Sequence, residues 1–299
     1  MPAKQVYRYL KPEALAKFQR LDLVARAVVE GFVSGLHRSP YHGFSVEFAE
    51  HREYVPGDNP RDLDWLALAR TDRYFIKQYE EETNLKAHLL LDCSGSMAFR
   101  SDGLSKLEYG CYLAASLAFL MVRQQDSVGL VAFDHKIRHF IPPGGTRIHL
   151  NLLLRTLEGL SGEGETDLSG TLHELAERIR RRGLIIVISD LYDEPREVLH
   201  ALSHFRHKKH EVMVFHVLHH HEVVFPYRRL TDFVDMETNQ KVQVDPAYVR
   251  EAYCRAIREF IDGYRRECAQ LNVEYVLTDT SVPFDNLLFA YLSKRQQVR

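Results

Sequence analysis

One short run of the chain ends an apolar strand on a carboxylate and follows it with two hydroxyls. Three leucines precede Asp92, and Ser94 and Ser96 follow at alternate positions. Much further along, Thr166 lies in a polar loop and Asp190 ends a second apolar run. All five side chains offer hard oxygen atoms, which suit Mg²⁺, Mn²⁺ or Ca²⁺. The sequence therefore predicts a divalent-cation site that leaves one coordination position for an outside group.

A simpler interpretation of the two serines is that they cap the next helix, as serine often does. That interpretation leaves Thr166 and Asp190 unexplained, so we favour the cation site.

Composition narrows the class of protein. The 299 residues are 45% hydrophobic, which is enough to bury a substantial core. The formal charge of −2 gives no general attraction to nucleic acid or to an anionic membrane. The four cysteines have no Cys-x-x-Cys spacing, as expected of a reduced, intracellular protein. Because no long apolar stretch or signal peptide is evident, we expect a cytoplasmic protein without membrane spans.

From residue 85 onward, apolar runs alternate with amphipathic segments. The predicted strands are 86–92, 127–133, 136–141, 184–190, 211–218 and 273–278. The predicted helices are 104–123, 147–158, 168–182, 194–207, 247–271 and 284–295. A hairpin over 222–246, with its turn at 237–240, interrupts the alternation. Before residue 85 the pattern predicts helices over 12–36 and 60–70, extended chain over 41–57 and a strand over 73–82.

Strands that alternate with helices predict an α/β fold: a mostly parallel, Rossmann-like sheet with helices on both faces. Ligands of such sheets bind beyond the carboxyl ends of the strands, where the strand order reverses. In the order 3-2-1-4-5-6, the strands that end on Asp92 and Asp190 are neighbours. The loop of Thr166 precedes the helix that leads into the second of these strands. Three loops should therefore converge on one crevice.

The five oxygen-bearing residues resemble the metal-ion-dependent adhesion site of von Willebrand factor A domains, which has an Asp-x-Ser-x-Ser run, a later Thr and a later Asp. The resemblance implies that Asp92, Ser94 and Ser96 form the primary ligand loop. It also implies that Thr166 is a direct ligand and that Asp190 binds directly or through water. A partner protein's Asp or Glu would complete the shell of Mg²⁺ or Mn²⁺.

A second resemblance covers almost the whole chain. Residues 43–82 contain, among others, Tyr54, Gly57-Asp58, Asp64-Trp65 and Tyr79-Glu80, and they look like the signature of a bacterial family known only as domain of unknown function fifty-eight. The segment from Asp235 to Pro246 looks like that family's insertion. The resemblance implies an N-terminal accessory segment (1–84) before a von Willebrand factor A-like domain (85–299) with its inserted hairpin. It also implies an adaptor protein paired with a MoxR-type AAA+ ATPase.

An enzyme is the competing class. A Mg²⁺-dependent phosphoryl hydrolase could use Asp92 as its nucleophile, since an Asp at a strand end also resembles the nucleophile of haloacid-dehalogenase-type phosphatases. That resemblance implies a second Asp two residues later as the general acid. That position is Ser94, whose hydroxyl has no useful acidity near neutral pH. The sequence also lacks a Gly-x-Ser-x-Gly elbow and a Gly-rich phosphate loop. We therefore expect a protein-binding module without catalysis.

Four other features have structural interpretations. His219-His220-His221 should be a solvated strand end, since neighbours on an extended segment point to opposite faces. The basic run from Arg178 to Arg182 should lie at a helix C-terminus, where cations are favourable. Cys93 should pack inward, and Trp65 should anchor the N-terminal segment.

Overall fold

The computed structural model describes residues 20–36, 51–53, 74–77, 85–101, 103–164, 166–236 and 240–298. The chain divides into two compact units, of which one is residues 36–84 and the other is the rest. In the smaller unit, strands β1 (His51–Glu53) and β2 (Phe75–Lys77) form an antiparallel pair, within segments predicted to be extended. The predicted helix 60–70, Trp65 and turn residues 237–239 lie outside the described residues.

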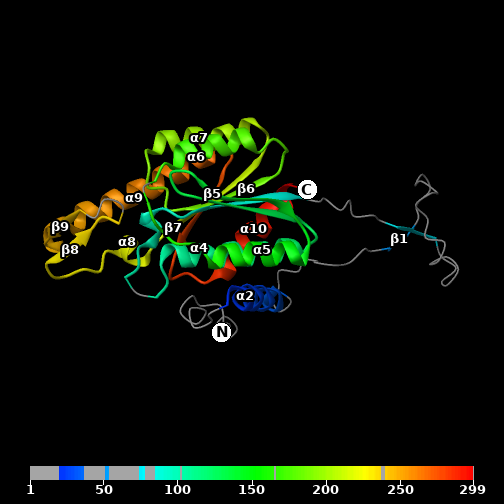
Figure 1. Cartoon of the computed structure of the whole chain (residues 1–299), viewed down its shortest axis with the longest axis horizontal. Helices are drawn as coiled ribbons and strands as arrows, with labels where there is room; N and C mark the ends of the chain where they lie inside the picture. The colour runs from blue at the N-terminus through cyan, green and yellow to red at the C-terminus, as the bar shows by residue number, and fades with distance from the viewer. Residues whose placement is uncertain are drawn as a thin grey trace. The chain divides into compact units, whose positions relative to one another are not determined.

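The larger unit is built on a central sheet covered by helices (Figure 1). The sheet has six strands in the order β10-β7-β6-β3-β4-β5. This is the predicted order 3-2-1-4-5-6, and only β5 runs antiparallel to its neighbour within this sheet. The strands are β3 (Lys86–Asp92), β4 (Ser127–Phe133), β5 (Ile137–Gly144), β6 (Leu184–Ser189), β7 (Glu211–Leu218) and β10 (Glu274–Asp279). Apart from Lys86 at the start of β3, the central strands β3 and β6 are buried because helices cover both faces.

Two layers of helices cover the sheet. On one face lie α6 (Leu168–Arg178), α7 (Pro195–His207) and α9 (Pro246–Gln270) (Figure 1). They pack on a core that includes Leu90 and Val187. On the other face lie α4 (Lys106–Arg123), α5 (Arg147–Glu158) and α10 (Phe284–Val298). Helix α2 (Leu21–Leu36) joins this unit, and the Leu21 amide donates to Glu158 Oε1. Among the described residues, no helix combines the length and apolarity needed to cross a membrane.

Helix α4 lies close to the sheet, and Gly110 allows that approach. A Cβ atom at Gly110 would lie 3.0 Å from Leu91 Cδ1 and 3.3 Å from Ile188 Cγ2, one side chain from each central strand. At its start, α4 has a capping box in which Ser105 Oγ accepts from the Glu108 amide and Glu108 Oε2 accepts from the Ser105 amide. The cap fixes where the helix begins, and so places its first residue, Lys106.

Four local predictions differ from the structure. Helix α6 ends at Arg178, so Arg180 to Arg182 follow the helix instead of forming its last turn. The triple histidine is no solvated strand end, because His219 is 1% exposed and caps the short helix α8 (His220–Val224). Helix α2 begins at Leu21, since Arg20 is not helical, and residues 12–19 of the predicted helix lie outside the described residues. The inserted hairpin is narrower than predicted and pairs β8 (Thr231–Val234) with β9 (Lys241–Val244).

Candidate functional site

Asp92 is the last residue of β3, and its carboxylate is held in place by two donors. The Ser94 amide donates to Oδ1 at 2.9 Å, and Ser189 Oγ donates to Oδ2 at 2.6 Å. Ser189 ends the neighbouring strand β6, and its Oγ in turn accepts from the Leu191 amide at 3.0 Å. Asp92 is fully buried, and among the described residues no cationic side chain forms an ion pair with it.

The loop after Asp92 brings its two serines together. Ser94 begins a single 3-10 turn (Gly95–Ala98), but its side chain makes no capping hydrogen bond. Instead, Ser94 Oγ lies 3.1 Å from Ser96 Oγ. The helix-capping interpretation of these serines therefore does not fit the geometry. Ser94 is buried and Ser96 is half-buried, so this loop reaches solvent through Ser96.

Backbone hydrogen bonds fasten the loop of Thr166 to the serine loop. The Gly95 amide donates to the Gly164 carbonyl at 3.0 Å, and the Glu163 amide donates to the Cys93 carbonyl at 3.1 Å. Arg138 strengthens this arrangement, because its guanidinium donates to the Glu163 carbonyl and to buried Asp134. Half-buried Thr166 follows two residues after Gly164, so its loop is held beside the serines.

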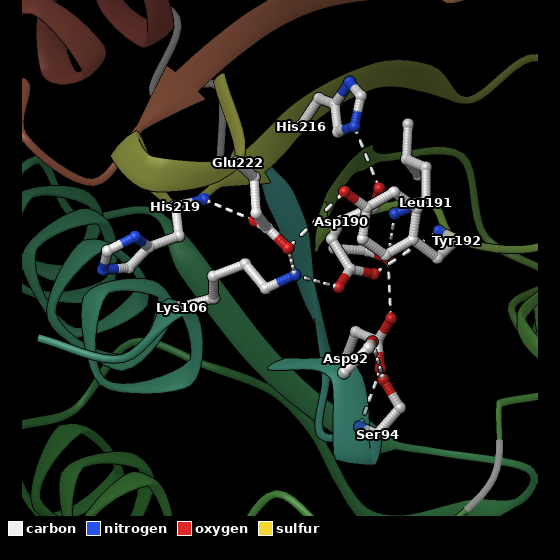
Figure 2. A network of polar contacts seen from close by, with 11 residues as sticks. Asp92, Ser94, Lys106, Asp190, Leu191, Tyr192, His216, His219 and Glu222 are labelled. Atoms are coloured by element: carbon white, nitrogen blue, oxygen red, sulfur yellow. Dashed lines mark hydrogen bonds and ion pairs between the residues drawn. The ribbon is translucent and has the colours of Figure 1, made fainter. Parts of the chain in front are cut away.

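Asp190 follows β6 directly, and its carboxylate pairs with a lysine (Figure 2). Lys106 Nζ lies 2.7 Å from Asp190 Oδ2 and 2.9 Å from Glu222 Oε1. The side chains of Lys106 and Asp190 are 1% and 0% exposed, while that of Glu222 is 14% exposed. The ammonium also lies 4.7 Å from the centre of the Tyr192 ring. Lys106 therefore connects Asp190 to α8, the short helix that precedes the inserted hairpin.

Burial and charge shape the protonation of this site. Burial, together with the charge of Asp190, raises the pKa of Asp92 to about 7. Burial by itself lowers the pKa of Lys106, but the charges of Asp190 and Glu222 outweigh it and raise that pKa overall, so the ammonium stays protonated. Burial lowers the pKa of His216 to about 4. Neutral His216 can then donate from Nε2 to the Asp190 carbonyl and accept at Nδ1 from the Tyr275 hydroxyl.

The structure brings together most of the residues expected from the sequence. Asp92 ends β3 and Asp190 directly follows the adjacent strand β6, and Ser94 and Ser96 face each other. Cys93 packs inward as predicted, and burial raises the pKa of its thiol to about 12, so it is not a reactive thiolate.

Sequence reasoning missed Lys106, Ser189, His216 and Glu222. A signal existed for Lys106, because a cation at the first position of a helix opposes the helix dipole and needs a nearby carboxylate. No short-range pattern in the sequence connects Glu222 with the site.

The donor set fits a hard divalent cation. Two neighbouring ligands of an octahedral ion with bonds of about 2.1 Å lie roughly 3 Å apart, close to the separation of the two serine hydroxyls. A cation would also neutralise the buried carboxylate of Asp92. In that arrangement Asp92, Ser94 and Ser96 would hold the ion, with Thr166 beside them.

The chain has an α/β fold of the von Willebrand factor A type. This follows from its strand order, its two helix layers and the position of the site at the carboxyl ends of β3 and β6. The model of the family described as "Protein of unknown function DUF58" matches residues 50–260, so the chain belongs to that family.

Curated relatives and solved structures resemble the chain more loosely. The uncharacterized protein Rv1480 of Mycobacterium tuberculosis (strain ATCC 25618 / H37Rv) is 27% identical over 254 residues, which cover 82% of this chain and 78% of that protein. The crystal structure of the conserved hypothetical protein BatB from Bacteroides thetaiotaomicron has a TM-score of 0.48 and 18% identity over 71% of this chain and 99% of BatB. The vWF domain of the type V pili tip protein Mfa5 from Porphyromonas gingivalis has a TM-score of 0.35 and 11% identity, over 71% of this chain and 95% of that domain. At such scores, the fold class rests on the strand order of the chain itself.

Proposed function

We propose that this protein is a metal-dependent protein-binding module. Its Mg²⁺ or Mn²⁺ would be held by Asp92, Ser94 and Ser96, with Thr166 as a further direct ligand. The observation that carries the proposal is the buried Asp92 carboxylate, which has two hydrogen-bond donors but no ion-pair partner among the described residues, beside two hydroxyls 3.1 Å apart. Burying a charge without a counter-charge is costly, and a bound cation removes that cost.

Lys106 supports a binding role for such an ion. The ammonium of Lys106 lies 2.7 Å from Asp190 Oδ2 and already neutralises the charge of Asp190 without a metal. Asp190 would then contact the ion through water. An ion held by one carboxylate and neutral hydroxyls keeps a net positive charge, and it attracts a carboxylate from outside. The half-buried Ser96 and Thr166 give such a group a path to the site.

The proposed partner is a protein that presents an Asp or Glu on an exposed loop. Membership of the family, together with the resemblance in the sequence, favours an adaptor role beside a MoxR-type AAA+ ATPase in the remodelling or assembly of protein complexes, in the cytoplasm. Binding to such an ATPase is part of the proposal and is testable with purified components.

The experiment is a pull-down of the co-expressed ATPase in Mg²⁺ and in EDTA. Wild type should retain the partner only in Mg²⁺, and Asp92→Ala and Thr166→Ala should lose it. Asp262→Ala, which removes an exposed carboxylate on α9, is the matched control and should behave as wild type. An interaction that survives EDTA unchanged would contradict the proposal.

A further inference from the structure

A cluster of histidine side chains lies on α6 and α7, away from the oxygen-rich site. Four histidines line one hollow of about 280 Å³ together with Ser203. They are His173 on α6 and His200, His204 and His207 on α7. His200 and His207 are exposed, so the hollow is accessible from solvent.

Two of these rings already have the spacing of metal ligands. His173 Nδ1 lies 3.3 Å from His204 Nδ1. Two Zn–N bonds of about 2.0 Å at a tetrahedral angle also place their nitrogens about 3.3 Å apart. The His200 ring centre lies 5.0 Å from that of His173. His200 precedes His204 by four residues, so both project from the same side of α7.

The carboxylate of Glu177 contacts the ring nitrogen of His204 that faces away from His173. Glu177 Oε1 is 2.9 Å from His204 Nε2, and Lys208 Nζ holds the other carboxylate oxygen at 2.7 Å. With its Nε2–H donating to Glu177, His204 presents the lone pair of Nδ1 to His173 Nδ1. Histidine ligands in proteins are commonly oriented by a carboxylate in this way. Burial, and then the charges of His200 and His204, lower the pKa of His173, which favours the neutral ring that a metal requires.

We propose that His173, His204 and His200 bind a divalent transition-metal ion, Zn²⁺ foremost, with Glu177 as the carboxylate that orients His204. In the described part of the chain, no group of three His, Cys, Asp or Glu side chains is arranged to hold a metal ion as the rings now stand. The pair His173–His204 is preformed, and the His200 ring completes the set by rotation. The ion replaces the proton shared by the two Nδ1 atoms, and that proton moves through solvent to His173 Nε2.

This ion would join two helices that begin beside the oxygen-rich site. Helix α6 follows the loop of Thr166, and α7 follows the loop of Asp190. The Ser169 amide, in the first turn of α6, already donates to Asp193 Oδ2, just before α7, at 2.9 Å. A metal bridge between the helices would fix these two loops relative to each other. Because imidazole and hard oxygen ligands favour different metals, the two sites can fill independently.

The test is calorimetric titration of the full chain with Zn²⁺, together with the visible spectrum of bound Co²⁺. Wild type should bind one Zn²⁺ at this site and give the absorption of tetrahedral Co²⁺. His173→Asn, His204→Asn and His200→Asn should each weaken Zn²⁺ binding at least tenfold and remove the Co²⁺ band. Glu177→Gln should weaken Zn²⁺ binding by about 10–100-fold, as loss of an outer-shell partner does.

Matched controls separate this site from its surroundings. His139→Asn, on the exposed surface of β5, and Glu174→Gln, on α6, should leave Zn²⁺ binding unchanged. Asp92→Ala should also leave it unchanged, so this inference and the proposed function can fail separately. Unchanged Zn²⁺ affinity in His173→Asn and His204→Asn would overturn the proposal, as would a wild type that binds no Zn²⁺. A loss in His207→Asn with none in His200→Asn would overturn the choice of His200.

Discussion

Replacing Lys106 by Met tests the ion pairs at the centre of the site. The ammonium lies 2.7 Å from Asp190 and 2.9 Å from Glu222, and its side chain is 1% exposed. Met keeps the length of the side chain but removes the charge, which leaves the carboxylate of Asp190 buried without its cation. Breaking a buried pair in this way costs about 3–5 kcal/mol. In a chain of 299 residues, that should lower Tm by roughly 5–8 °C.

Chemical denaturation in EDTA measures this loss directly. Lys136→Met, at an exposed turn, is the matched control and should stay within about 0.5 kcal/mol of wild type. Glu222→Gln should cost less than Lys106→Met, because Glu222 is partly solvated and Asp190 keeps its cation. Adding Mg²⁺ should stabilise Lys106→Met more than wild type, since the ion can then take up the charge of Asp190. Equal stability of the Lys106 and Lys136 variants would refute this reasoning.

Three further predictions concern acid stability, helix packing and catalysis. Burial lowers the pKa of His88 to about 4. As the pH falls, the unfolded chain therefore takes up a proton on this residue before the folded chain does. The stability that is present above pH 6.5 is lost as the pH falls toward 4. His88→Leu should reduce the loss of unfolding free energy between pH 7.5 and pH 5 by about 2 kcal/mol, and an unchanged pH slope would contradict it. Gly110→Val should lower the free energy of unfolding by about 1–3 kcal/mol, because the added side chain would press on Leu91 and Ile188. Gly263→Ala in α9, where an added Cβ meets nothing within 4 Å, should instead raise it by up to about 1 kcal/mol. Denaturation curves measure both changes. Purified protein with Mg²⁺ should not hydrolyse phosphomonoesters, and turnover that disappears in Asp92→Asn would favour the hydrolase instead.

Local pattern determined much of the fold. The apolar runs ending at Asp92 and Asp190 are long and lie between clear helices, so the strands and their order could be derived from the sequence. The residues at which helices begin and end were harder to predict. Helix α6 ends at Arg178 although a basic run continues beyond it, because the cap at Ile179 and the buried strand that follows decide its length.

The site was predictable only where its residues follow strand ends. Asp92, Ser94, Ser96 and Asp190 could be placed together because the carboxyl ends of adjacent strands meet at one edge. Thr166 could be added only because its loop precedes α6, the helix that leads into β6. Lys106 and Glu222 are 116 residues apart in the chain, and their pairing depends on where α4 and α8 begin. Likewise, His173 and His204 meet only because α6 packs beside α7. Such contacts arise from tertiary packing, which periodicity alone does not reveal.

The most direct test of the central claim is titration of the purified, metal-free protein with Mn²⁺, followed by electron paramagnetic resonance of the free ion. Wild type should bind one Mn²⁺ at this site, and Asp92→Ala and the Ser94→Ala/Ser96→Ala double variant should lose it while keeping the wild-type circular dichroism spectrum. Because the pKa of Asp92 is raised to about 7 by burial and by Asp190, protons compete with the ion, and binding should weaken below that pH. Equal Mn²⁺ affinity in wild type and Asp92→Ala would contradict the account.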